Sequence, residues 1–244
     1  MNNEVVGSCR PHKVDATHAN AVKARNPLRA SQALRAAIRK RGGQVGSITY
    51  FYSAKNNRDL VFSTEVAFAC GVLLEADERV KGYELDDDQI KKQLAEQGFV
   101  GQIPSAIVTR WAERPLLLEV MADGRAISPS SRETRQSHAA LIEAEWGLFD
   151  KQSAEAKSRL LHDWIQISPI LSQHITQVSA QWDFLSKQVC TACFKPKTLG
   201  ELRAFCLAPW ELVFTTIFRL SQLSILTTDL DALPLSASTV VKNK

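Results

Sequence analysis

The spacing of hydrophobic residues predicts strands and helices in alternation along the first half of the chain. Apolar residues recur three to four positions apart over 64–75, which predicts an amphipathic helix. The β-rich run at 48–53 predicts a strand before it, followed by a turn at 55–58. Two further apolar runs, at 102–109 and 115–121, predict a pair of strands joined by a short turn.

The middle of the chain is expected to be mainly helical. Helical spacing covers 132–149 and then 151–176, so we predict helices there, in addition to a short basic one at 29–40. The three aspartates at 86–88 suggest a metal site at first sight. Consecutive residues on a turn point in different directions, however, so a solvated charged run is the favoured interpretation.

The pattern changes from Thr198 onward. Thr198, with Glu201 three residues later, forms a capping box that begins a short helix. Pro209 lies at the first turn of a second helix, predicted over 209–223. Two short strands around a turn at 231–234 complete the chain. Helix, helix, strand, turn and strand is the element order of a winged helix.

Length and hydropathy narrow the class of protein. A chain of 244 residues is one large domain or two small ones. It contains no apolar run near the roughly 20 residues that a membrane-spanning helix needs. The first residues lack the apolar stretch of a signal peptide. We therefore expect a cytoplasmic protein without membrane contact.

The five cysteines do not form an evident disulfide set, because their number is odd. Cys190 and Cys193 have the spacing of half a zinc site, and Cys206 and His174 are conceivable further ligands. A second Cys-x-x-Cys or Cys-x-x-His pair is missing. Reduced thiols packed as small hydrophobic groups are therefore the favoured interpretation, and no metal is predicted.

Basic residues are concentrated at the start of the chain. Residues 1–58 contain eleven Lys and Arg against two acidic residues, whereas the remainder has 19 basic and 24 acidic residues. A basic arm on a mildly acidic body is typical of proteins that bind phosphate backbones or an acidic partner. The alternative is a flexible tail that only improves solubility. The residues expected to contact DNA are Arg35, Arg39, Lys40, Arg41 and Lys55.

The predicted strand pair has the layout of a PD-(D/E)xK nuclease site. Such a site needs Pro-Asp on the first strand and Glu-x-Lys on the second. Here the first strand carries Pro104 and Ser105, and the second carries Glu119 and Met121. The layout is therefore present, but an acid and a lysine that the chemistry requires are replaced.

Several short motifs occur in the order and spacing of a known family. They are Ser53-Ala54-Lys55, Phe62, Leu74-Glu75-x-Asp77-x-x-Val80, Pro104, Glu119-Val120, Leu199-Gly200-Glu201-Leu202 and Thr239-Val240. With these motifs the chain resembles the TnsA family, the endonuclease subunit of heteromeric DNA transposases, over about residues 30–244. The resemblance implies an α/β fold, with a restriction-endonuclease-like mixed sheet flanked by helices and then an α+β winged-helix domain. We expect a flexible basic arm at 1–28, the endonuclease-fold domain at 29–155 and the winged-helix domain at 156–244.

The resemblance also locates the family's catalytic positions in this chain. They fall on Ala67, Ser105, Glu119 and Met121, so a single carboxylate remains. One carboxylate does not assemble a Mg²⁺ site for phosphodiester hydrolysis, and methionine cannot replace the lysine. No intact catalytic residue and no cofactor are therefore expected.

The function implied is that of a catalytically inactive TnsA-like component of a DNA transposition complex. It would bind transposon-end DNA and bridge the DDE transposase and the AAA+ ATPase regulator, either alone or beside an active TnsA-like paralogue. The setting implied is the bacterial cytoplasm, with association to the nucleoid when bound to DNA.

Two alternatives stay open. The first is an active Mg²⁺-dependent endonuclease that cuts the non-transferred strand through a rearranged site, using Asp123, Arg114 or Arg125. The second is a winged-helix DNA-binding regulator. It is disfavoured because the helix at 209–223, which would read DNA, carries a single basic residue, Arg219.

Overall fold

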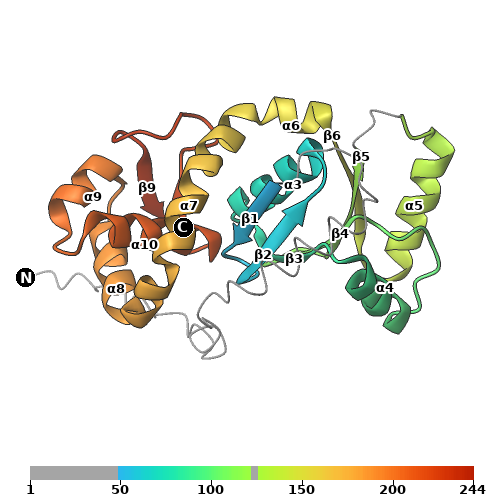
Figure 1. Cartoon of the computed structure of the whole chain (residues 1–244), viewed down its shortest axis with the longest axis horizontal. Helices are drawn as coiled ribbons and strands as arrows, with labels where there is room; N and C mark the ends of the chain where they lie inside the picture. The colour runs from blue at the N-terminus through green and yellow to red at the C-terminus, as the bar shows by residue number, and fades with distance from the viewer. Residues whose placement is uncertain (1–48, 122–125) are drawn as a thin grey trace, which may run out of the picture.

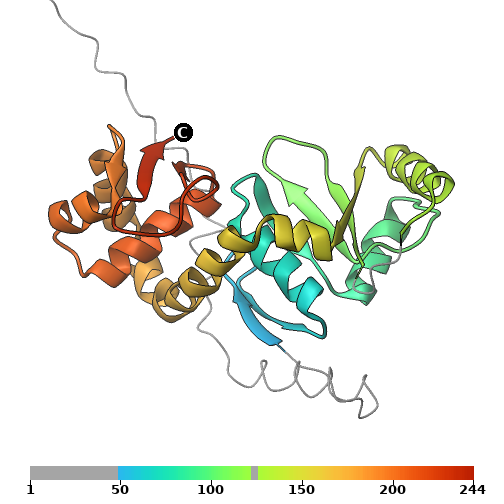
Figure 2. The same ribbon diagram turned by 90° about the horizontal axis from the view of Figure 1, so that it is seen from above.

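The computed structural model describes residues 49–121 and 126–244. It is a mixed α/β structure with two parts, and helices α6 (Lys151–Ala156) and α7 (Ser158–Ala180) run between them (Figures 1 and 2). The expected mixed sheet flanked by helices is confirmed. The predicted arm at 1–28, the helix at 29–40 and the basic residues Arg35 and 39–41 lie outside the described residues.

The first part is built on a four-stranded sheet in the order β3-β4-β5-β6. The strand β5 pairs antiparallel with β4 and parallel with β6. Helix α3 covers one face, and α4 and α5 cover the other (Figure 1). A separate hairpin, β1-β2, packs beside α3. The elements of this part are β1 (Thr49–Ser53), β2 (Arg58–Phe62), α3 (Glu65–Ala76), β3 (Val80–Glu84), α4 (Asp87–Glu96), β4 (Ala106–Arg110), β5 (Leu116–Met121), α5 (Pro129–Leu141) and β6 (Glu145–Asp150).

The second part consists of helices and a three-stranded antiparallel sheet in the order β7-β9-β8. The capping box predicted at Thr198 is confirmed, since its hydroxyl accepts from the Glu201 backbone N–H at 3.1 Å and the Glu201 carboxylate accepts from the Thr198 N–H at 2.8 Å. The elements here are α8 (Trp182–Ala192), β7 (Lys197–Thr198), α9 (Leu199–Phe205), α10 (Trp210–Gln222), β8 (Leu226–Thr228) and β9 (Val240–Asn243).

The helix predicted over 132–149 is wrong in its second half. Helix α5 ends at Leu141, and Glu145–Asp150 form the parallel strand β6. The helix stops in a Schellman motif, in which the Ala144 N–H donates to the Ala139 carbonyl at 3.0 Å and Glu143 adopts a positive φ of 55°. Glycine usually occupies such a position. Because glutamate does so here, the sequence gives no stop signal.

Two strands and one cap also differ from the prediction. Strand β2 occupies 58–62, which we expected to lead directly into the helix, and β3 was not predicted because Lys81 and Gly82 interrupt its apolar pattern. The aspartates at 86–88 are exposed, as expected of a solvated charged run, but they begin a helix: the Asp86 carboxylate caps α4 by accepting from the Asp88 and Gln89 N–H groups.

One hydrophobic core connects the two parts. It includes Phe51 of β1, Val72 of α3, Ile167 of α7 and Phe218 of α10, each at most 7% exposed. A smaller cluster lies between the sheet and helices α4 and α5. The domain boundary expected at 155/156 falls at the end of α6 and stays a prediction, but the main core continues across it. Within the described residues, no helix combines the length and hydrophobicity needed to cross a lipid bilayer.

Candidate functional site

The two strand positions of the predicted nuclease site lie next to each other. Ala106 of β4 opposes Leu118 of β5, so Ser105 and Glu119 meet at the same end of the strand pair. The Ser105 hydroxyl accepts a hydrogen bond from the Val120 backbone N–H at 3.0 Å. Ser105 therefore links the two strands through its side chain.

The carboxylate of Glu119 is buried and already paired with an arginine. Glu119 is 9% exposed and forms an ion pair with Arg135 of helix α5. The same guanidinium donates to the Gln102 side-chain oxygen at 2.7 Å and lies 5.9 Å from the ring centre of Trp146. The cavity beside this pair measures about 10 Å³, which is room for about one water molecule. A metal ion with its water ligands would not fit without displacing Arg135.

Ala67 does not lie on the same side of the sheet as Glu119. Side chains of a strand alternate between faces, so Leu117, Glu119 and Met121 of β5 share one face, toward α5. Leu118 belongs to the core on the opposite face, where Ala67 of α3 also packs. Even a carboxylate at position 67 would be separated from Glu119 by the sheet.

The residues considered for a rearranged site do not complete it either. Arg114 is exposed in the turn between β4 and β5, at the end of β5 that is remote from Glu119. Asp123 and Arg125 lie outside the described residues. Among residues 49–121 and 126–244, no group of three or more His, Cys, Asp and Glu side chains is arranged to hold a metal ion.

Lys55 occupies a different environment from the one expected of a DNA contact. Its ammonium donates to the carbonyl oxygens of Leu74 at 2.8 Å and Asp77 at 2.5 Å, at the C-terminal end of α3. These carbonyls have no partner within the helix, and a cation satisfies them well. Burial lowers the pKa of Lys55 to about 8, against the opposing charges of Glu75 and Asp77. This environment does not support the prediction that Lys55 contacts DNA, because its charge is used inside the protein.

Glu75 is the centre of this buried polar cluster. It is 1% exposed and accepts from the Ser53 hydroxyl at 2.7 Å and from the Lys55 backbone N–H at 2.9 Å. Burial raises the pKa of the Glu75 carboxyl, while the charge of Lys55 acts in the opposite direction. The Ser53-Ala54-Lys55 and Leu74-Glu75 motifs of the sequence thus meet in three dimensions as one structural unit.

The cluster extends into the C-terminal part of the molecule. The Gln222 side-chain amide of α10 is 3.4 Å from both the Glu75 backbone carbonyl and its carboxylate. Gln222 in turn accepts from Arg219 at 3.0 Å, and burial lowers the pKa of Arg219. Arg219, the single basic residue of α10, therefore belongs to this internal network and not to a DNA-reading surface.

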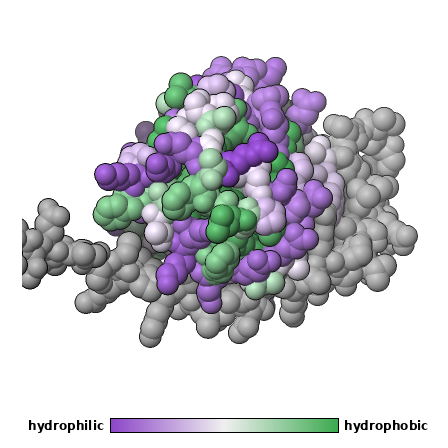
Figure 3. All heavy atoms as spheres, turned by 90° about the vertical axis from the view of Figure 1, so that its left-hand side faces the viewer, coloured by the Kyte–Doolittle hydropathy of each residue, from purple (hydrophilic) through white to green (hydrophobic). Residues whose placement is uncertain are grey.

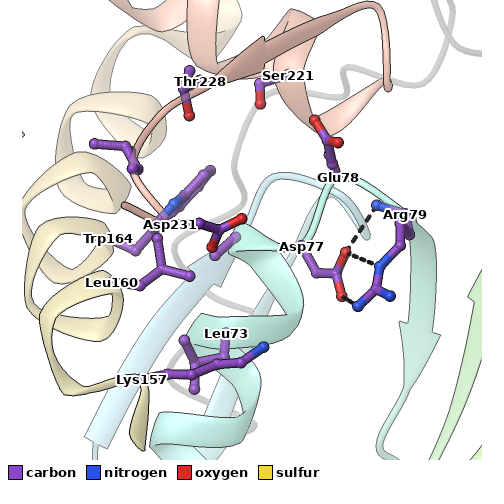
Figure 4. A pocket seen from close by; sticks show the side chains of 12 residues that line it. Leu73, Asp77, Glu78, Arg79, Lys157, Leu160, Trp164, Ser221, Thr228 and Asp231 are labelled. Atoms are coloured by element: carbon purple, nitrogen blue, oxygen red, sulfur yellow. Dashed lines mark hydrogen bonds and ion pairs between the residues drawn. The ribbon is translucent and has the colours of Figure 1, made fainter. Parts of the chain in front are cut away.

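A cavity of about 300 Å³ lies beside the same junction, between the end of α3, the start of α7 and the segment after α10 (Figure 4). Asp77 and Arg79 pair with each other at its edge, at 2.7 Å. Burial favours protonated Asp77, but its hydrogen bonds with Arg79 outweigh this effect and lower the pKa of Asp77. The remaining charged residues of the lining are two acids and one base, Glu78, Asp231 and Lys157. This near balance does not select an anion or a cation.

The cysteines considered as zinc ligands are packed as thiols. Cys193 and Cys206 are buried, and Cys190 is partly buried. Burial raises the pKa of Cys193 to about 12, with smaller contributions from Cys190 and Cys206. His174 forms its hydrogen bond with Gln177 of the same helix, at 3.3 Å.

Sequence reasoning found Glu119 and Ser105 but missed Arg135, the residue that forms the ion pair with Glu119. No signal in the sequence marks one arginine of α5 as the partner of a strand carboxylate, since the pairing depends on how α5 lies on the sheet. Comparison with models of known protein families gave no match, and comparison with curated proteins also gave none.

Proposed function

We propose that this chain is a catalytically inactive, TnsA-like component of a DNA transposition complex. In this role it binds transposon-end DNA and bridges a DDE transposase and an AAA+ regulator. The observation that carries the proposal is the ion pair of Glu119 with Arg135. A strand pair with the layout of a nuclease site holds its one acid in a buried ion pair, next to a serine where metal coordination requires an aspartate.

The topology supports the finer features of the proposed fold. Strands β4 and β5 with α3 on one face are consistent with a restriction-endonuclease-like domain. The C-terminal order α8, β7, α9, α10, β8, β9, with β9 between β7 and β8 in the sheet, supports a winged-helix domain. In such a domain α10 takes the position of the recognition helix.

The burial of α10 favours a protein-binding role over DNA reading. All residues from Leu212 to Phe218 are buried, although a helix that enters the major groove must expose one face. Arg219 is held by Gln222. The alternative of a winged-helix regulator that reads base sequence is therefore less well supported. In the proposed function, DNA is bound through the phosphate backbone by Arg35, Arg39, Lys40 and Arg41.

The alternative of an active endonuclease has no observation in its favour. Two-metal and one-metal mechanisms both need carboxylates that can reach the ion and a group that stabilises the phosphorane. The Glu119 oxygens are bound to Arg135, the Ser105 hydroxyl faces a backbone amide, and Met121 carries no charge.

Nicking and binding assays on supercoiled DNA that carries the ends of the encoding element test the proposal. We expect no nicking by the full chain with Mg²⁺ or Mn²⁺, and salt-dependent binding that weakens when Arg35, Arg39, Lys40 and Arg41 are changed to alanine. Lys91→Ala/Lys92→Ala is the matched control, since both lysines are exposed on α4. Metal-dependent nicking that Glu119→Gln abolishes would establish the endonuclease instead. Equal loss of binding in both variants would refute the assignment of these four residues as the DNA contacts.

The bridging role is tested separately, with the transposase and the regulator of the same element. We expect the chain to co-elute with each of them in size-exclusion chromatography and to form a three-component complex. Failure to bind either protein would refute the bridge even if DNA binding holds.

A further inference from the structure

Three large apolar side chains project from the C-terminal part into solvent. Phe194 is 80% exposed, Phe205 59% and Leu207 92%. They lie where α8 ends and where α9 leads into α10. Figure 3 views the molecule from this end, and hydrophobic groups gather in the middle of the face. We call Phe194, Phe205 and Leu207 the apolar patch.

The residues of the apolar patch adjoin two buried thiols in the sequence. Phe194 follows Cys193, and Phe205 and Leu207 flank Cys206; both cysteines are buried. The Cys206 thiol is close enough to Cys193 to contribute to the raised pKa of Cys193, and α8 packs on α9. The three exposed side chains are therefore each next in sequence to one of two buried thiols that lie close together. Their combined area is roughly 400 Å², taking 150–250 Å² for a fully exposed large side chain, which is within the range of functional patches on monomers.

The rim of the patch is basic. The charged residues over 184–211 are four cations and two acids, namely Lys187, Lys195, Lys197, Arg203, Glu201 and Glu211. One of the acids is already used, because the Glu201 carboxylate accepts from the Thr198 N–H and pairs with Lys197 at 3.4 Å. Arg203 lies 5.9 Å from the ring of Trp210, which keeps its charge beside the patch. A partner that covers the apolar centre will meet an excess of positive charge.

We propose that the apolar patch docks an acidic amphipathic helix of a partner protein. An amphipathic helix presents apolar side chains three and four positions apart, and acidic residues beside that stripe would meet the basic rim. A second copy of this chain fits poorly, since a symmetric contact would place the two basic rims against each other. The patch is also about half of the roughly 800 Å² that each partner contributes to a standard stable interface, which suits a single helix.

The proposal rests on the proposed bridging function, which requires a surface that holds another protein. It adds the place and the chemistry of that surface. It differs from the DNA contacts, which belong to a segment near the other end of the chain, so the two can fail independently.

The test is a fluorescence-anisotropy titration of the full chain with a labelled 20-residue synthetic helix that carries leucines at i, i+3, i+4 and i+7 and glutamates elsewhere. The test variant is Phe205→Ser/Leu207→Ser. The matched control is Val100→Ser/Leu141→Ser, because both of these residues are 78% exposed and lie in the first part of the molecule. We expect the wild type and the control to bind equally and the patch variant about 30-fold more weakly, the effect of losing one interface hot spot.

Several outcomes would overturn the proposal. No binding of the acidic helix by the wild type is one. Equal binding of a peptide with lysine in place of glutamate would show that binding does not depend on the peptide's charge. Equal binding of a scrambled acidic peptide would show that it does not depend on amphipathicity. Concentration-dependent dimers in sedimentation, lost in the patch variant, would identify a second copy as the occupant. Plasmid binding by the patch variant, measured in parallel, shows whether the proposed function fails together with the docking site.

Discussion

Removing the buried carboxylate at the junction should destabilise the whole molecule in a pH-dependent way. In Glu75→Gln the amide can still accept from Ser53 and from the Lys55 backbone, so the hydrogen-bond geometry is largely kept. What is lost is the negative charge that acts on the buried Lys55 ammonium, whose own hydrogen bonds go to the Leu74 and Asp77 carbonyls. Breaking one partner of a buried charged pair costs about 3–5 kcal/mol in comparable cases.

The titration of lysine sets an independent upper limit on this loss of folding stability. A buried ammonium that loses its countercharge can release its proton, which costs about 1.4 kcal/mol for each pH unit below the unfolded-state pKa of about 10.5, or roughly 5 kcal/mol at pH 7. The wild-type folded protein keeps this proton up to a pKa of about 8. In Glu75→Gln the folded-state pKa of Lys55 falls below that value. Between the new pKa and 8, only the variant gains stability as pH rises, since its unfolded state binds one more proton than its folded state.

Urea unfolding at pH 7 and pH 8 measures both quantities. We expect a loss of about 3–4 kcal/mol at pH 7 that shrinks by about 1 kcal/mol at pH 8. The double variant Glu75→Gln/Lys55→Met should recover stability relative to Glu75→Gln and lose this pH dependence. Glu155→Gln is the control, because its exposed pairing with Lys151 contributes about 0–1 kcal/mol. A loss below 1 kcal/mol, or one that is the same at both pH values, would show that water reaches the cluster and would refute the reasoning.

Three further changes test packing, capping and the strand carboxylate. Gly71→Ala should destabilise by about 1–3 kcal/mol in thermal unfolding, because an added Cβ would lie 2.4 Å from the Phe62 ring; an unchanged Tm would mean that the ring moves freely. Thr198→Ala should cost about 1 kcal/mol by loss of the capping box, while Thr198→Ser, which keeps the hydroxyl, should cost little. Arg135→Met should destabilise by about 3–5 kcal/mol because it leaves Glu119 without its partner, and restoration in Arg135→Met/Glu119→Gln would confirm the pairing; equal stability of all three proteins would contradict it.

The local elements of the fold were predictable because each has a signal in the sequence. The helix at 64–75 follows from its apolar spacing and the strand pair from two apolar runs around a short turn. The capping box at Thr198 follows from two residues three positions apart. The errors arose where the deciding interaction is not local. Strand β6 pairs with β5, some thirty residues earlier in the chain, and the helix before it ends on Glu143 without a glycine.

The candidate site was predictable only as a set of positions. The sequence placed Ser105 beside Glu119, and the register of β4 and β5 agrees. It could not assign faces to the sheet, so Ala67 was grouped with residues that lie on the opposite side. It also treated Lys55 as a surface cation. Burial of a lysine depends on acceptors from distant segments, here the carbonyls at the end of α3, and these leave no mark near residue 55.

Under the proposed function, the distinction between structural and catalytic positions explains how such a chain can keep its fold without nuclease chemistry. Ser53, Lys55 and Glu75, which carry part of the resemblance to the TnsA family, bind one another and connect the hairpin, α3 and α10. Their contribution is to folding stability and does not depend on DNA cleavage. Among the positions that depart from the family pattern, Ser105 makes a hydrogen bond with the Val120 backbone, and Ala67 packs against the apolar core. Selection for a bridging subunit would retain the first group and leave the second free to change, and a buried carboxylate at Glu119 would then require a new partner such as Arg135.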